Sequence, residues 1–212
     1  PVGSGKSTLV NVLARFSPVP AGTVFVDGVV VNDLPVQRLR ASLAYVPQEA
    51  FLFSRTIRDN VTLGHPEADE DEVDRAVGLA RLSRDLESFP AGLETRVGER
   101  GVTLSGGQRQ RATLARAAIG ERSILILDDS LSAVDSDTER EILAELRGLM
   151  EGRTTILITH RFSNLVDMDR IVVIEDGRVV EQGSHEELLA RDGTYAHLYR
   201  RHRLEERLEA SP

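Results

Sequence analysis

Short apolar runs, rich in β-branched residues, alternate along the chain with segments whose apolar residues recur at helical spacing. This alternation predicts an α/β fold with a mainly parallel sheet. The predicted strands span residues 23–26, 43–46, 124–127, 155–159, 170–175 and 179–182. The predicted helices span residues 6–15, 36–42, 70–80, 106–119, 138–150, 186–191 and 194–207.

Two stretches refine this pattern. Residues 51–119 contain no good strand, so this block is expected to be a helical insertion between two strands of the sheet. The Asp176-Gly177 pair joins two β-rich runs and predicts a hairpin. No apolar run approaches the roughly 20 residues needed to cross a bilayer, so no membrane span is expected within the chain.

Composition narrows the class of protein. A length of 212 residues favours one compact domain, and 41% apolar with 28% charged residues is ordinary for a globular protein. The net charge of -8 argues against nucleic acid as a partner, because a polyanion needs a basic face. The chain has no cysteine, which excludes disulfides and cysteine-ligated zinc.

The first eight residues, P-V-G-S-G-K-S-T, match all but the first glycine of the phosphate-binding pattern G-x-x-x-x-G-K-[ST]. That glycine would lie one residue before Pro1, so we expect the chain to begin inside the motif. Lys6 is the one lysine among 26 basic residues. A compact ammonium enters a phosphate cradle differently from a planar guanidinium, which explains a lysine at this position.

This loop predicts a nucleotide site. Gly3 and Gly5 let the backbone turn its N–H groups toward one anion, and the helix that follows adds its dipole. Lys6 is expected to contact the β- and γ-phosphates, while the Ser7 hydroxyl is expected to hold Mg²⁺. The residues predicted to bind ATP here are Gly3, Ser4, Gly5, Lys6, Ser7 and Thr8.

Two further strands end in candidate catalytic groups. The apolar run 124–127 leads into Asp128 and Asp129, and the run 155–159 leads into His160. Ligands of open parallel sheets bind at the carboxyl ends of the strands. Asp128 is therefore expected to hold Mg²⁺ and Asp129 to face the water that attacks the γ-phosphate.

A more specific string, L-S-G-G-Q, occupies residues 104–108. Ser105 is a good helix cap, and two glycines leave the start of the next helix open to a second anion. The string resembles the signature motif of the ATP-binding cassette (ABC) family. The order of that family's motifs is completed by Y-V-P-Q at 45–48 (Q-loop), S-A-V-D at 132–135 (D-loop) and T-H-R at 159–161 (switch histidine).

The resemblance covers essentially the whole chain. It implies a P-loop NTPase (RecA-like) core formed by residues 1–50 and 119–212, with residues 51–118 as the helical part that carries the signature. It also implies a head-to-tail pair of such domains, in which ATP on the Lys6 loop of one chain is covered by the signature of the other. The residues that it assigns to the second nucleotide, the metal and the water are Ser105, Gly106, Gly107, Gln108, Asp135 and Gln48.

Residues 51–60, F-L-F-S-R-T-I-R-D-N, are similar to the exporter type of this family, in which membrane and ATPase portions share one chain. Residues 95–101 and 176–188 resemble the same group. The resemblance implies a transmembrane domain fused upstream, absent from this chain, on which the helical block docks. It places the domain on the cytoplasmic face of the cell (inner) membrane.

The sequence departs from the family at Asp129, where most members carry glutamate. Aspartate is one methylene shorter, and a misplacement of about 1 Å can cost about 10²-fold in rate. We therefore expect ATP to bind well on this chain's own loop but to be hydrolysed slowly, which favours a heterodimer over a homodimer. The alternatives are an ABC ATPase of DNA repair or translation, disfavoured by the short helical block and acidic charge, and an inert regulatory partner.

Overall fold

The computed structural model describes residues 4–98 and 102–209. The chain divides into two compact units. We call residues 1–19 together with 159–212 the terminal unit, and residues 20–158 the central unit. Each unit is described by itself.

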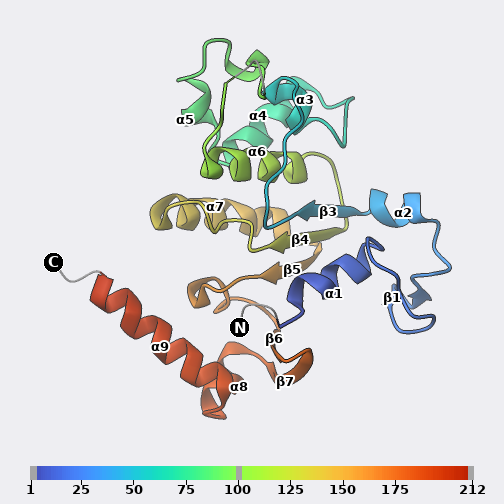
Figure 1. Ribbon diagram of the computed structural model, residues 1–212, viewed down its shortest axis with the longest axis vertical. Coiled ribbons are helices and arrows are strands. Elements are labelled where there is room, and N and C mark those ends of the chain that lie inside the picture. The colour runs from blue at the N-terminus through green and yellow to red at the C-terminus, as the bar shows by residue number, and fades with distance from the viewer. Residues whose placement is uncertain (1–3, 99–101, 210–212) are drawn as a thin grey trace. The chain divides into compact units, whose positions relative to one another are not determined.

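The central unit is built on a parallel sheet of β3 (Leu43–Val46), β4 (Ile124–Asp128) and β5 (Thr154–Ile158), in that spatial order (Figure 1). Leu43 lies opposite Ile124, which in turn lies opposite Thr154. The three central residues of β4, 125–127, are 0% exposed, because a middle strand of such a sheet is covered on both faces. The predicted parallel α/β arrangement is confirmed.

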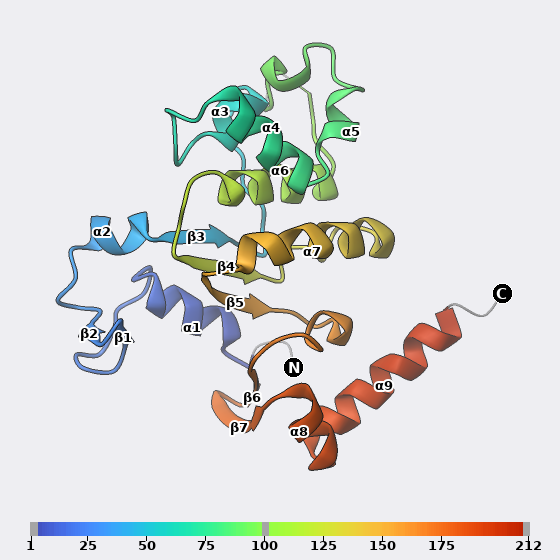
Figure 2. The same cartoon turned by 180° about the vertical axis from the view of Figure 1, so that it is seen from behind.

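Helical segments complete the central unit, as far as its residues are described. They are α2 (Val36–Ala41), α3 (Ile57–Val61), α4 (Glu70–Leu79), α5 (Ser83–Leu86), η1 (Gly92–Glu94), α6 (Gly106–Ala118) and α7 (Ser136–Met150). Figures 1 and 2 show α3, α4 and α5 on the far side of α6 from the sheet. Between β3 and β4 the described residues form helices, turns and isolated bridges but no strand, as the pattern predicts. A short hairpin of β1 (Phe25–Val26) and β2 (Val29–Val30) precedes α2.

The terminal unit contains α1 (Lys6–Leu13), η2 (Phe162–Asn164), β6 (Ile171–Glu175), β7 (Arg178–Gly183), α8 (His185–Ala190) and α9 (Thr194–Glu209). Strands β6 and β7 form the predicted hairpin, and Asp176 and Gly177 at its turn have φ values of 47° and 72°. Two successive left-handed residues match the twist of a tight hairpin. The buried residues of this unit include Ile171, Val173, Leu188 and Tyr195.

The predicted elements differ from the observed ones mainly at their ends and in the shortest segments. Helix α7 begins two residues earlier than expected, because Asp135 caps it. The sequence pattern missed β2, α3 and α5, which have two, five and four residues. No helix in the described part of the chain is long and apolar enough to cross a membrane.

Candidate functional site

The residue before α1 has a left-handed backbone conformation. Gly5 is the N-cap of α1 in the left-handed region, at φ 93° and ψ 9°, and no side chain caps the helix. A Cβ added to Gly5 would meet no atom within 4 Å, so the space in front of this residue is open. A β-carbon would strain the backbone there, which is the physical reason for glycine. Gly3 lies outside the described residues.

Lys6 projects from the first turn of α1. Its Nζ donates a hydrogen bond of 3.0 Å to Oγ of Ser4, a buried residue that is 5% exposed. Ser7 is half-buried and Thr8 is exposed on the same turn. The ammonium group is therefore held beside the loop that precedes it.

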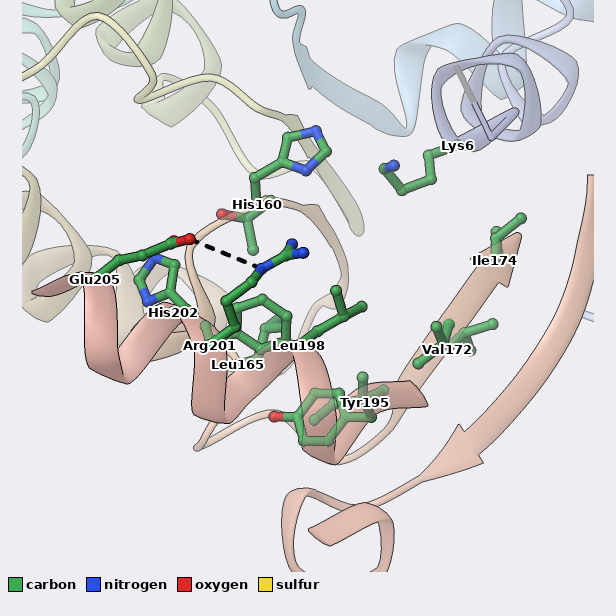
Figure 3. A pocket seen from close by; sticks show the side chains of 14 residues that line it. Lys6, His160, Leu165, Val172, Ile174, Tyr195, Leu198, Arg201, His202 and Glu205 are labelled. Carbon is green, nitrogen blue, oxygen red and sulfur yellow. Dashed lines mark ion pairs between the residues drawn. The ribbon is translucent and has the colours of Figure 1, made fainter. Parts of the chain in front are cut away.

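Lys6 and His160 line one cavity of the terminal unit, with a volume of about 420 Å³. Figure 3 shows these two side chains at one side of the cavity, and Arg201 and Glu205 from α9 at another, joined by an ion pair of 3.8 Å. The wall is otherwise largely apolar, with Leu165 from the segment after η2 among its members. His160 itself is exposed. Two residues predicted to act on the nucleotide thus line the same cavity.

The carboxyl ends of β3 and β4 meet at one edge of the sheet in the central unit, where Val46 pairs with Leu127. Asp128, the last residue of β4, is 3% exposed, and its Oδ2 accepts a hydrogen bond of 3.4 Å from the hydroxyl of Tyr45. Burial, and secondarily the negative charge of Asp128, raises the pKa of Tyr45 to about 12. The phenol therefore stays protonated at neutral pH and can donate to the carboxylate.

Asp129 and Gln48 follow the same edge. Asp129 has a left-handed φ of 43°, and its N–H donates to the carbonyl of Ile158 at the end of β5 at 2.8 Å. Its backbone is therefore fixed to the neighbouring strand, with a half-buried side chain. Gln48 lies two residues beyond β3 and is exposed.

The second glycine-rich helix start has a complete internal cap. Ser105 Oγ accepts from the N–H of Gln108 at 3.2 Å, and Gln108 Oε1 accepts from the N–H of Ser105 at 2.9 Å. This reciprocal pair satisfies two donors at the start of α6. Asp135 caps α7 in a similar way, since its Oδ1 accepts from the N–H of Thr138 at 2.9 Å.

Asp85 of α5 also supports the start of α6, a role that no pattern in the sequence indicates. Its Oδ1 accepts from Nε2 of Gln108 at 3.1 Å, and its Oδ2 accepts from Nη2 and Nε of Arg111 at 2.7 and 3.0 Å. The two charged side chains are 15% and 14% exposed. Asp85 lies 23 residues before Gln108 and has the polar character of an ordinary surface residue, so the local sequence does not indicate this contact.

The candidate metal ligands fit Mg²⁺, which takes few protein ligands, better than a metal ion that is coordinated by protein side chains alone. Within residues 4–98 and 102–209, no group of three or more His, Cys, Asp or Glu side chains is arranged to hold a metal ion. Mg²⁺ usually takes one or two carboxylates and keeps water and phosphate oxygens for the rest of its shell. Asp128, a buried carboxylate at a sheet edge, fits that kind of ligand set.

The predicted site residues thus form two sets. Lys6, Ser7 and His160 belong to the terminal unit, where Lys6 and His160 share a cavity. The other set belongs to the central unit, and its members are Gln48, Ser105, Gly106, Gly107, Gln108, Asp128, Asp129 and Asp135. Within that unit, Gln48, Asp128 and Asp129 share one sheet edge, and Ser105 and Gln108 cap α6.

Known proteins resemble this chain closely. A sequence profile of the family described as ABC transporter matches residues 1–132. The ATP-dependent lipid A-core flippase of Paraburkholderia xenovorans (strain LB400) is 50% identical over 200 residues, which cover 94% of this chain and 33% of that protein. The probable multidrug resistance ABC transporter ATP-binding/permease protein YheI of Bacillus subtilis (strain 168) is 46% identical over 202 residues, or 95% of this chain and 34% of that protein.

A solved structure also matches. The structure of a bacterial Atm1-family ABC exporter with ATP bound has a TM-score of 0.88 and 42% sequence identity to this chain. The match covers 95% of this chain and 35% of that one. The chain therefore spans about a third of the length of the curated relatives that it matches.

Proposed function

We propose, starting from the fact that the chain belongs to the ABC transporter family, that it is the ATP-binding and ATP-hydrolysing domain of an exporter. One observation carries the proposal: α1 begins at a left-handed glycine that no side chain caps, with an ammonium beside it. Such a helix start binds a phosphate through backbone N–H groups and the helix dipole. The named relatives are an ATP-dependent flippase and a multidrug resistance transporter, which supports export as the work that ATP drives.

The residues of this chain take roles that follow from their chemistry. The loop from Gly3 to Thr8 binds the phosphates, and Lys6 neutralises the charge on the β- and γ-phosphates. Asp129 orients the attacking water, and Gln48 and His160 act on that water and on the γ-phosphate. These groups work by positioning and by electrostatic stabilisation, which dominate phosphoryl transfer.

Magnesium completes the site. Ser7, Gln48 and Asp128 would hold Mg²⁺, which when bound neutralises charge that develops on the phosphates. Tyr45 supports this role, because its hydroxyl faces Asp128 Oδ2 and orients the carboxylate. Nearly complete burial of Asp128 also keeps competing water away from one side of it.

A second nucleotide-binding domain is the proposed partner. In a head-to-tail pair, the signature residues 105–108 and Asp135 would cover ATP bound to the Lys6 loop of the other domain. The start of α6 suits this role because a helix N-terminus attracts a phosphate through its N–H groups and dipole.

The site on this chain's own loop is proposed to be slow. The N–H of Asp129 is bonded to the carbonyl of Ile158 at 2.8 Å, which opposes a forward shift of the backbone that would compensate for the missing methylene. The shorter reach favours pairing with a different domain that carries glutamate, so that the protein is a heterodimer. In a homodimer, the shorter Asp129 side chain would have to orient the attacking water in both sites.

A transmembrane domain is the other proposed partner, with this domain on the cytoplasmic face of the inner membrane. Phe51 and Phe53 support a docking surface, since they are 61% and 42% exposed and pack edge to face at 5.0 Å. The fully buried Asn60 holds this segment, because its amide accepts from the N–H of Phe53 at 2.7 Å and donates to the Phe53 carbonyl at 2.9 Å. Exposed aromatic pairs on a held backbone are typical of protein interfaces.

The first test is Lys6→Ala in the intact transporter. We expect nucleotide affinity and transport to fall by about 10²-fold, because a charged donor to the phosphates is lost. Arg201→Ala is a matched control, since it removes another cation from the wall of the same cavity but not from the glycine loop. Unchanged ATP binding and transport in Lys6→Ala would overturn the proposed function.

The second test concerns the rate of this chain's own site. Single-turnover hydrolysis is measured there with the partner's site disabled, in the natural protein and in Asp129→Glu. We expect the glutamate to raise the rate by about 10- to 100-fold. If the natural protein hydrolyses ATP at full speed and Asp129→Glu gives no gain, the proposal of a slow site in a heterodimer is overturned in favour of a homodimer with ordinary sites.

A further inference from the structure

Gln110 of α6 is a buried polar side chain that none of the proposed roles uses. It is 4% exposed and lies two residues beyond the signature string. Both ends of its amide are bonded: Oε1 accepts from the N–H of Ala133 at 2.9 Å, and Nε2 donates to Oγ of Ser132 at 3.2 Å. Buried amides that satisfy both ends fix the groups they join. This side chain therefore links α6 to the turn at residues 131–134.

The same turn touches the glycines of the signature. A Cβ on Gly107 would lie 3.1 Å from the carbonyl oxygen of Ala133, and a Cβ on Gly106 would lie 3.4 Å from the Cβ of Ala133. The first distance is tighter than ordinary van der Waals contact. The two glycines thus allow close approach of the turn within the same chain, as well as leaving the helix start open.

The turn is held on either side of its exposed tip. Leu131 and Val134 are 5% and 4% exposed and anchor it in the core, whereas Ser132 and Ala133 are exposed. The N–H of Ser132 donates to the carbonyl of Asp129 at 3.3 Å, which connects the turn to the catalytic edge of the sheet. Without the Gln110 amide, the exposed tip would lose both of the side-chain hydrogen bonds that join it to α6.

We propose that Gln110 is a positioning residue that ties the turn at residues 131–134 to the signature helix, so that the two segments present one rigid surface to the ATP site of the partner domain. This inference rests on the proposed head-to-tail pairing. One end of this link lies just after signature residues 105–108, and the other end lies just before Asp135. The signature and Asp135 are both proposed to meet the same nucleotide. A displacement of about 1 Å between them costs about 10²-fold in rate when reacting groups must be aligned.

The test uses Gln110→Met in the intact transporter, which keeps a long flexible side chain but removes both hydrogen bonds. Thr113→Val is the matched control. Thr113 is 2% exposed on the same helix, and its hydroxyl donates to the carbonyl of Arg109 at 2.9 Å without reaching the turn. Three quantities are measured: hydrogen exchange at the Ala133 amide without nucleotide, single-turnover hydrolysis at the partner's site, and ATP binding to this chain's own Lys6 loop.

We expect Gln110→Met to speed exchange at Ala133 by about tenfold or more, because its acceptor is lost. Hydrolysis at the partner's site is expected to slow by about tenfold or more, with ATP binding on the Lys6 loop unchanged. Thr113→Val should change neither. If both variants behave alike in exchange and in hydrolysis, the inference is overturned.

A milder variant keeps the test decisive if Gln110→Met fails to fold. Ser132→Ala removes the acceptor of Gln110 Nε2 from an exposed side chain. It should slow the partner's site by a few-fold, and an unchanged rate would overturn the inference. Failure of the proposed function itself is distinguishable, because there Lys6→Ala would leave ATP binding intact.

Discussion

Helices α1 and α6 both begin at a glycine-rich string, yet the two helix starts are built differently. The N-cap of α1 is Gly5, left-handed and without a side-chain cap. The N-cap of α6 is Ser105, extended at φ -64° and ψ 165°, and it forms a reciprocal cap with Gln108. The first start has no side-chain cap and is proposed to be the receptor for a phosphate, whereas the second is capped by its own side chains. Similar glycine-rich strings therefore produce a start without a side-chain cap in one place and a preformed cap in the other.

The start of α6 is also held from a distance, since Gln108 and Arg111 both donate to Asp85 of α5. A surface that must fit another protein benefits from such long-range anchoring, because its shape then depends little on the ligand.

Removing the distant anchor gives the largest expected change. Asp85→Ala leaves the Arg111 guanidinium, 14% exposed, without its carboxylate and removes the acceptor of Gln108 Nε2. We expect the opening free energy of the first two turns of α6 to fall by about 2 kcal/mol, less than for a fully buried pair because some solvent reaches both groups. Hydrogen exchange of the α6 amides measures this change.

Arg84→Ala is the control for Asp85→Ala. Arg84 is the neighbouring residue of the same helix, is 74% exposed, and makes a weak ion pair of 3.8 Å with Glu141. Such exposed pairs contribute about 0–1 kcal/mol, so the α6 amides should exchange as in the natural protein. Equal effects of the two variants would mean that α6 does not depend on long-range anchoring.

The next effect tests the receptor-like start. Gly5→Ala places a β-carbon at φ 93°, where an L-residue is strained by about 1–2 kcal/mol. The free loop can relieve this strain by leaving the conformation that binds phosphate. We expect nucleotide affinity to fall by about 5- to 30-fold, measured by ATP titration.

Gly22→Ala separates strain from binding. Gly22 also has a left-handed φ, 70°, with nothing within 4 Å of an added Cβ, and it lies in a turn before β1. Similar strain there should leave ATP affinity unchanged. A loss of affinity in both variants would show that Gly5 matters for stability alone.

The sequence predicts the regular parts of the molecule well, because their signals are local. Strand β3 matches its predicted bounds, β4 is one residue longer at its end, and β5 is shifted by one residue toward the N-terminus, since apolar runs of four or five residues dictate buried strands. Helices α3 and α5 were missed because five and four residues are too few to show helical spacing. The order β3-β4-β5 depends on tertiary pairing and needed the structure.

The candidate site divides in the same way. Glycine strings, strand-end carboxylates and caps are local, so the sequence alone predicts site roles for Gly5, Lys6, Asp128 and Ser105. Asp85 and Gln110 contact residues that are 23 and 22 positions away or more, through side chains whose types are ordinary for a helix surface. Their contacts arise from packing, which spacing along the chain does not encode.

The smallest expected effect concerns the preformed cap. Ser105→Ala removes the oxygen that accepts from the N–H of Gln108, and loss of such a cap costs about 1 kcal/mol. Ser184→Ala removes a cap of the same kind at α8, where Ser184 Oγ accepts from the N–H of Glu187 at 3.2 Å. Hydrogen exchange should therefore report similar fraying in the first turn of each helix.

Only Ser105→Ala should also slow hydrolysis at the partner's site, because only α6 is proposed to face the second nucleotide. Equal hydrolysis rates in the two variants would mean that the cap of α6 serves the fold alone, and the contrast between the two glycine-rich helix starts would then be one of stability and not of function.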